Sequence, residues 1–151
     1  MRFLTKVDLS KLSPSIFLTV YEKDISNNVY WNNLVYNRKI IDYSFYINLH
    51  EIEQGIKVNN KDTTLDKFLI SQIKSCILHK KHFIFINGNF ITKDSRKKII
   101  EIGNETNYEV VCVHFTEKNE LPTRDDLLIR KIIKENPPSI DEGLTKIITI
   151  N

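Results

Sequence analysis

The sequence has little of the residues that mark several protein classes. Its 151 residues include four glycines, four prolines, two cysteines and one tryptophan, and alanine is absent. Two cysteines are too few for a small disulfide-stapled scaffold, and Cys76 and Cys112 lack the spacing of metal ligands. Because both cysteines lie in apolar stretches, we expect buried, reduced thiols.

Long apolar runs are also missing. No run approaches the roughly 18 residues of a transmembrane helix. The N-terminus, MRFLTKVDLSKLSPS, lacks the long apolar core of a signal peptide. We therefore expect a cytoplasmic protein without membrane contact. The scarcity of glycine and alanine, with abundant lysine, asparagine and isoleucine, is typical of AT-rich genomes such as those of phages, viruses or low-GC bacteria.

The residues that are present are typical of an ordinary globular protein. Hydrophobic residues make up 41% of the chain and charged residues 27%. Residues 1–151 are expected to form a single domain, large enough to bury a core. The net charge of +3 permits contact with nucleic acid but does not argue for it, because dedicated binders concentrate more charge.

Strand and helix patterns alternate along the chain. Apolar runs predict five strands, at Ser15–Val20, 42–48, 82–86, 108–115 and Lys146–Ile150. Capping residues and three- and four-residue spacing predict helices at 27–36, from Thr63 or Thr64 to His79, after Thr92, and from Thr123 to Lys134. The polar stretch 52–64 is expected to be a loop or a short helix. The alternation predicts an α/β three-layer sandwich with a mainly parallel five-stranded sheet.

The segment from Lys81 to Phe115, KHFIFINGNFITKDSRKKIIEIGNETNYEVVCVHF, reads as one βαβ unit. It resembles part of the P-loop kinases related to polynucleotide kinase and zeta toxin. Those kinases carry D-x-T-N, an apolar residue and T-x-x-x-R, where this chain has NGNFITKDSR ending at Arg96. The tail from Pro137 to Leu144 is similar to their P-x-x-x-E-G pattern. The resemblance covers about residues 14–150 and implies a P-loop NTPase- or kinase-like fold.

The positions that carry catalysis in these kinases hold other residues here. Residues 21–28, YEKDISNN, follow the first strand without the glycines that a phosphate-binding loop needs. Asn48 and Glu51 stand where the family has a general-base Asp and a substrate-binding Arg, and Asn87 replaces another family Asp. The Arg-bearing lid is reduced to residues 116–122. The resemblance thus implies a catalytically inactive, pseudokinase-like protein that does not bind ATP and uses no cofactor.

Aromatic residues in the first third of the chain are the main candidates for a binding surface. They are expected either to pack in the core or to bind a macromolecule, since Tyr and Trp dominate binding hot spots. The expected surface covers the degenerate phosphate loop and consists of Tyr21, Glu22, Asp24, Tyr30 and Trp31. Its acidic residues favour a protein partner over nucleic acid. If the source is a phage, the partner would be a host protein.

A nucleic-acid-binding remnant of a polynucleotide kinase is a second interpretation. Lys80, Lys81, Arg96 and Lys97 would then line one groove and contact phosphates, so that binding weakens steeply with salt. The alternative is that basic runs such as RKK form solvated helix faces.

A third interpretation is an active but atypical nucleotide or polynucleotide kinase. It requires a catalytic acid outside the family position, and Asp24 and Asp42 are the candidates. No metal site is expected, because no acidic partner is spaced to complete one with a histidine. The histidines are His50, His79, His82 and His114.

Overall fold

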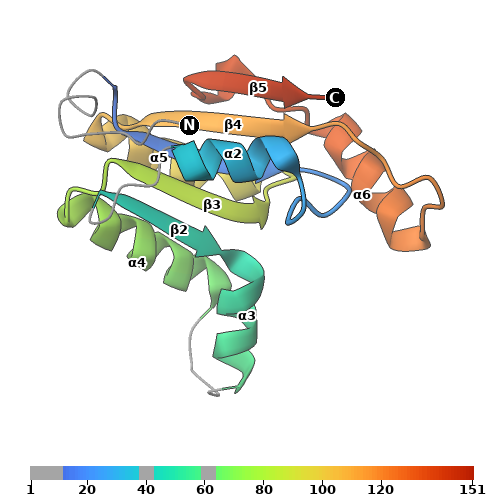
Figure 1. Ribbon diagram of the computed structural model, residues 1–151, viewed down its shortest axis with the longest axis horizontal. Helices are drawn as coiled ribbons and strands as arrows, with labels where there is room; N and C mark the ends of the chain where they lie inside the picture. The colour runs from blue at the N-terminus through green and yellow to red at the C-terminus, as the bar shows by residue number, and fades with distance from the viewer. Residues whose placement is uncertain (1–11, 38–42, 59–63) are drawn as a thin grey trace.

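The computed structural model describes residues 12–37, 43–58 and 64–151. The strands in these ranges are β1 (Ser15–Val20), β2 (Ser44–Asn48), β3 (Phe83–Asn89), β4 (Glu109–Phe115) and β5 (Lys146–Ile150). The helices are α2 (Val29–Asn37), α3 (Leu49–Val58), α4 (Leu65–Leu78), α5 (Lys93–Thr106) and α6 (Arg124–Glu135), and the short 3-10 turn η1 (Ile140–Glu142) precedes β5. Figure 1 shows their arrangement.

The five strands form one sheet in the order β2-β3-β1-β4-β5, and every neighbouring pair is parallel. The predicted α/β class is therefore confirmed, and the sheet is parallel throughout. The order differs from the two common doubly wound orders, 3-2-1-4-5 and 2-1-3-4-5. It puts β1 in the centre and leaves β2 and β5 at the edges.

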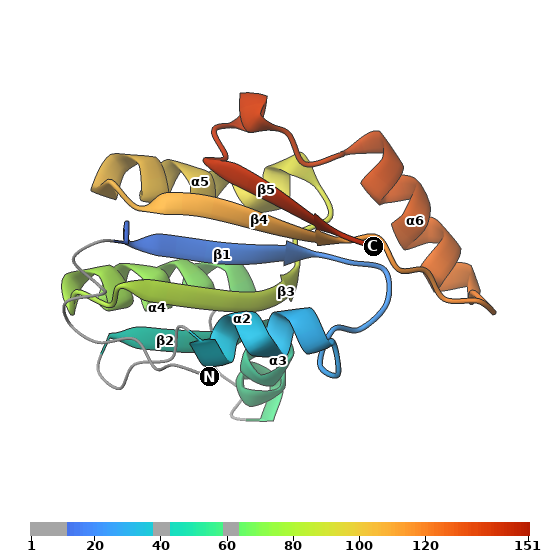
Figure 2. The ribbon, with the colours of Figure 1, turned by 45° about the horizontal axis from the view of Figure 1, so that its top comes forward.

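Helices cover both faces of the sheet, which gives three layers (Figures 1 and 2). On one face, α3, α4 and α5 pack on alternate strand residues such as Ile16, Leu18 and Ile86. On the opposite face, α2 packs Trp31 and Leu34 against strand residues that include Phe17, Phe85 and Val113. All six residues of β1 are buried, as expected for a central parallel strand that is covered on both sides.

Threonine caps begin three of the helices at the expected positions. The hydroxyl oxygens of Thr64, Thr92 and Thr123 accept hydrogen bonds from backbone N–H groups in the first turns of α4, α5 and α6. Of the stretch 52–64, expected to be a loop or a short helix, residues 52–58 belong to the short helix α3, which begins directly after β2 at Leu49.

Both cysteines are buried, as the sequence predicts. Burial raises the pKa of the Cys112 thiol to about 12. No helix in the described ranges combines the length and the apolar character that crossing a membrane requires.

Candidate functional site

The carboxyl ends of β1 and β3 are where this topology would hold a ligand. The chain leaves β1 through α2 on one face and leaves the adjacent β3 through α5 on the other face. Open α/β sheets bind ligands in the crevice outside the strand ends at such a switch point. Asn48 and Asn87, which the sequence resemblance aligns with catalytic positions of the kinases, lie at the same edge, where they are register partners on β2 and β3.

Hydrogen bonds join the ends of β1 and β3 across this crevice. The Thr19 hydroxyl donates to the Gly88 carbonyl at 2.6 Å, and the Phe90 N–H donates to the Thr19 carbonyl at 3.1 Å. The Tyr21 N–H, the first after β1, donates to Asn89 Oδ1 at 3.0 Å. Backbone donors that would face a ligand in an open crevice are therefore used within the chain.

Asn87 is buried between two tyrosines. Its Oδ1 accepts a hydrogen bond from the Tyr21 hydroxyl, and its Nδ2 donates to the Tyr46 hydroxyl, both at 3.3 Å. Burial, followed by the nearby Asp24 and Tyr46, raises the pKa of Tyr21 to about 12, so this phenol stays protonated at neutral pH. The Asn87 amide thus links two tyrosine side chains and offers no carboxylate that could act as a base.

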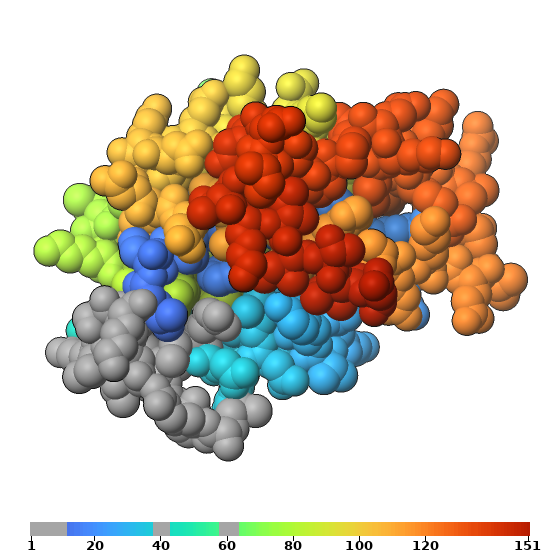
Figure 3. All heavy atoms as spheres, turned by 90° about the horizontal axis from the view of Figure 1, so that it is seen from above, coloured from blue at the N-terminus to red at the C-terminus, as the bar shows by residue number. Residues whose placement is uncertain are grey.

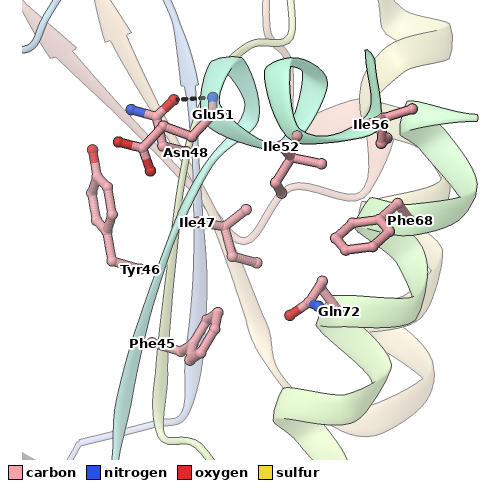
Figure 4. Close-up of a pocket in the computed structure, with 10 residues that line it drawn as sticks. Phe45, Tyr46, Ile47, Asn48, Glu51, Ile52, Ile56, Phe68 and Gln72 are labelled. Atoms are coloured by element: carbon pink, nitrogen blue, oxygen red, sulfur yellow. Dashed lines mark hydrogen bonds between the residues drawn. The ribbon is translucent and has the colours of Figure 1, made fainter. Parts of the chain in front are cut away.

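Asn48 has a structural role at the start of α3. Its Oδ1 accepts hydrogen bonds from the backbone N–H groups of His50 at 3.0 Å and Glu51 at 3.3 Å, which is N-terminal capping. Figure 4 shows the bond from Glu51. Glu51 is exposed in the first turn of the helix, where its negative charge is favoured by the helix dipole.

Side-chain oxygens of the loop after β1 accept hydrogen bonds from two nearby backbone N–H groups. The Asp24 carboxylate accepts from both the backbone N–H and the hydroxyl of Ser26. Asn28 Oδ1 accepts from the Trp31 N–H at 2.9 Å and so caps α2. A phosphate-binding loop presents such N–H groups to an anion, whereas here side-chain oxygens already occupy them.

Glu22 is the second acid of this loop, and it binds Arg130 of α6 in a two-pronged ion pair. Arg130 Nε lies 2.5 Å from Glu22 Oε1, and Nη2 lies 3.0 Å from Oε2. The Asn119 N–H adds a third hydrogen bond at 2.8 Å. The hydrogen bond from Arg130 is the main reason why the pKa of the buried Glu22 is lowered. Glu22 therefore anchors α6, which contains no buried residue of its own.

A pocket of about 400 Å³ lies beside this ion pair, between the end of β4 and α6. Its lining includes His114, Lys118 and Lys134. Burial, and then the charge of Arg96, lowers the pKa of His114, which favours a neutral imidazole at pH 7.

Arg96 is fully buried, and its guanidinium donates four hydrogen bonds within the protein. Its Nε and Nη2 donate to the Glu142 carboxylate at 2.9 and 3.2 Å, and it also donates to the carbonyls of Phe90 and Asn136. Arg96 lies in the βαβ segment 81–115 and Glu142 in the tail segment 137–144, so this ion pair joins the two segments. The expectation that Arg96 contacts a phosphate is corrected here, because its guanidinium faces the protein interior.

The basic residues expected in one groove are separated. Lys80 and Lys81 follow the C-terminus of α4, whereas Lys97 lies near the N-terminus of the parallel helix α5. A helix of 14 residues spans about 21 Å, so these lysines lie at opposite ends of the α4–α5 layer. A different basic groove, lined by Lys67, Lys74 and Lys98 together with Asp66, runs between the two helices.

The expected partner surface is only partly exposed. Trp31 is 1% exposed, packs edge-on against Phe85 and Phe115, and carries the one buried side-chain nitrogen without a hydrogen-bond partner among the described residues. Glu22 is also buried, Tyr21 is half-buried, and Asp24 and Tyr30 are exposed. Asp42, one candidate acid, lies outside the described residues.

Exposed aromatic side chains gather instead on α2 and β2. The four in the described ranges are Tyr30, Tyr36, Phe45 and Tyr46. Tyr36 of α2 and Phe45 and Tyr46 of β2 line a common pocket of about 440 Å³. Sequence reasoning treated Phe45 and Tyr46 as part of an aromatic first third, but it did not predict that they would stay exposed at a sheet edge.

The comparisons with known proteins give no family for this chain. No family model matches it, and no curated protein matches it in sequence. Within the described residues, no group of three or more His, Cys, Asp or Glu side chains is placed to hold a metal ion.

Proposed function

We propose that this chain is a non-catalytic, pseudokinase-like binding protein whose partner is another protein. The carrying observation is the distribution of its aromatic residues, since all four exposed aromatic side chains in the described ranges lie on the adjacent elements α2 and β2. Tyr is enriched at binding hot spots because it buries a large apolar surface and keeps a polar end.

The carboxyl edge of the sheet supports the non-catalytic half of the proposal. Asn87 links two tyrosines, Asn48 caps a helix and Glu22 binds Arg130. Each of these groups already has a structural partner where a kinase would need a free base, a free loop or a free lid arginine.

Calorimetric titration of Mg-ATP into the full chain tests the non-catalytic half. We expect no heat of binding at millimolar nucleotide. Saturable binding at micromolar concentration would overturn this half, and the search for a phosphate acceptor would follow.

Site-directed photo-crosslinking tests the protein-binding half. A photoreactive phenylalanine analogue at Tyr36 or Tyr46 should crosslink a partner protein, whereas the same analogue at Leu78, an exposed apolar residue at the end of α4, should not. The purified partner should then bind the natural chain, and Tyr36→Ala should weaken that binding about tenfold. Equal crosslinking from all three positions would contradict the proposal.

A further inference from the structure

The edge strand β2 lies between two pockets on opposite faces of the sheet. Phe45 and Ile47 share a face with Ile84 and Ile86, and Tyr46 shares the opposite face with Phe85. The α3–α4 pocket, about 320 Å³, is lined by Phe45, Ile47, Ile52, Ile56, Phe68 and Gln72. The α2 pocket, about 440 Å³, is lined by Asn32, Val35, Tyr36, Ser44, Phe45, Tyr46 and Phe85, so Phe45 borders both pockets.

Figure 4 shows the α3–α4 pocket in detail. Phe45 and Ile47 point from β2 toward Phe68 and Gln72 of α4, with Ile52 and Ile56 of α3 above them. Tyr46 points to the other side of the strand. The pocket is therefore mostly apolar, with polar groups at its ends, as in many binding pockets.

β2 also lacks the features that usually protect an edge strand. Among the described strands its ladder is with β3, and its sequence, SFYIN, contains no charged residue and no proline. Natural edge strands commonly carry lysine or proline, which prevents another strand from pairing with them. Phe45 and Tyr46 are instead 38% and 44% exposed.

From this geometry we infer that β2 binds an extended peptide of the partner protein as a sixth strand of the sheet. Successive side chains of a strand point to opposite faces, so alternate apolar residues of the peptide enter the α3–α4 pocket and the α2 pocket. Backbone hydrogen bonds to β2 supply affinity and the two pockets supply specificity. The inference rests on the proposed function, since it names how the partner protein is recognised.

Charge specifies the peptide further. Glu51 lines the α3–α4 pocket beside the end of β2 and forms no ion pair in the described structure, whereas the nearby Glu53 is paired with Lys57. A lysine or arginine of the peptide next to Glu51 would complete this end of the site.

A second copy of this chain is a poorer occupant of the same edge. In an edge-to-edge pair, the Phe45 and Ile47 side chains of each copy already point into that copy's own α3–α4 pocket. Such a pair leaves both pockets unfilled, whereas a foreign peptide brings side chains that fill them.

Selection from a displayed library of random dodecapeptides on the full chain tests the inference. Enriched peptides should alternate apolar and polar residues and carry a lysine or arginine near one end. In the synthetic peptide, N-methylation of the alternate residues that face β2 should abolish binding, and methylation of the other set should leave it within about twofold. This comparison uses the natural protein, so it does not depend on whether a variant folds.

Protein variants give an independent test. Phe45→Ala should weaken binding of the synthetic peptide about tenfold, and Glu51→Lys should shift selection toward peptides with Asp or Glu. Leu128→Ala on the exposed surface of α6 should change nothing and is the matched control. Circular dichroism would confirm that each variant is folded.

Three results would overturn the inference. The first is that no peptide is enriched, and the second is that methylation of neither set of residues changes binding. The third is that the natural chain forms a dimer that Tyr46→Arg dissociates, which would show that a second copy occupies the β2 edge. If any of these occurs while crosslinking from Tyr36 and Tyr46 still finds a partner, the proposed function stands and strand addition fails. If crosslinking also finds none, both fail.

Discussion

The centre of the sheet and its β2 edge differ in how their polar and aromatic groups are used. At the centre, the ends of β1 and β3 are joined by hydrogen bonds, and Asn87 has partners on both sides. At the β2 edge, Phe45 and Tyr46 stay exposed beside two pockets. Under the proposed function, the strand ends at the centre serve a structural role and the partner binds at the β2 edge.

Removing the buried ion pair between Arg96 and Glu142 should reduce stability more than any other change. Arg96→Met removes a fully buried cation and leaves the Glu142 carboxylate, whose side chain is 10% exposed, without its partner. Losing one member of a buried ion pair costs about 3–5 kcal/mol of unfolding free energy, which urea denaturation would measure.

The exposed ion pair of Lys23 and Glu117 is the matched control. Lys23→Met should leave the urea midpoint unchanged, because both side chains are solvated. Equal destabilisation by the two variants would show that the core does not depend on Arg96.

Alanine substitutions at two glycines would test how tightly side chains are packed at the centre of the sheet and near its β2 edge. A Cβ at Gly103 of α5 would lie 2.2 Å from Val110 Cγ2, while a Cβ at Gly55 of α3, beside the α3–α4 pocket, meets nothing within 4 Å. Gly103→Ala should therefore destabilise the protein by about 1–3 kcal/mol. Gly55→Ala should stabilise it by about 0.5–1 kcal/mol, since alanine favours helices. Thermal unfolding would detect both changes in stability. If both substitutions stabilised the protein, or both destabilised it, the predicted difference between the two regions would be wrong.

Alkaline pH should lower the stability of the protein through the buried phenol of Tyr21. The pKa of Tyr21 rises from 10.0 in the unfolded chain to about 12 in the folded protein. The stability that this phenol contributes is therefore fully present below pH 10 and is lost as pH rises toward 12. Tyr21→Phe should reduce the slope of stability against pH in this window compared with the natural chain. Cys112, whose pKa is also raised to about 12, adds the same background to both proteins.

A backbone change remote from both regions should have the smallest effect. Lys80 has φ 58° after α4, where its N–H and that of Lys81 bond back to the Ile77 and Cys76 carbonyls in a Schellman motif. Glycine adopts this conformation without strain, so Lys80→Gly should stabilise the protein by about 0.5 kcal/mol. Peptide binding at β2 should not change, which calorimetry on the same variant would check.

Much of the framework was predictable because its signals are local. Ser15–Val20 is a buried central strand, and a run of apolar residues is typical of such strands. Thr64, Thr92 and Thr123 act as caps because a hydroxyl before a helix accepts from the first turn. The fold class followed from the alternation of these elements.

The role of Arg96 was not predictable from its neighbours. It opens the run RKK, which is typical of a solvated helix face, yet its partner Glu142 lies 46 residues away. Glu22 is a similar case, because Arg130 is 108 residues away. Such pairs depend on which elements the fold brings together, and no local pattern encodes this.

The shape of the molecule explains the remaining differences. Tyr46 and Trp31 are both aromatic, but Trp31 of α2 is buried between this helix and the sheet, whereas Tyr46 lies on an edge strand. In Figure 3, α6 and the segment before it form one end of the molecule (orange), where Glu22 binds Arg130 and the partly buried Ile133 packs against the core.

Backbone NMR of the full chain, titrated separately with Mg-ATP and with the selected peptide, would test the central claim most directly. The account predicts that the peptide shifts the amide signals of 45–48 and that millimolar Mg-ATP leaves those of 21–28 and 87–90 in place. Saturable shifts of 21–28 and 87–90 with Mg-ATP would contradict it, because they would show an open ligand crevice at the centre of the sheet.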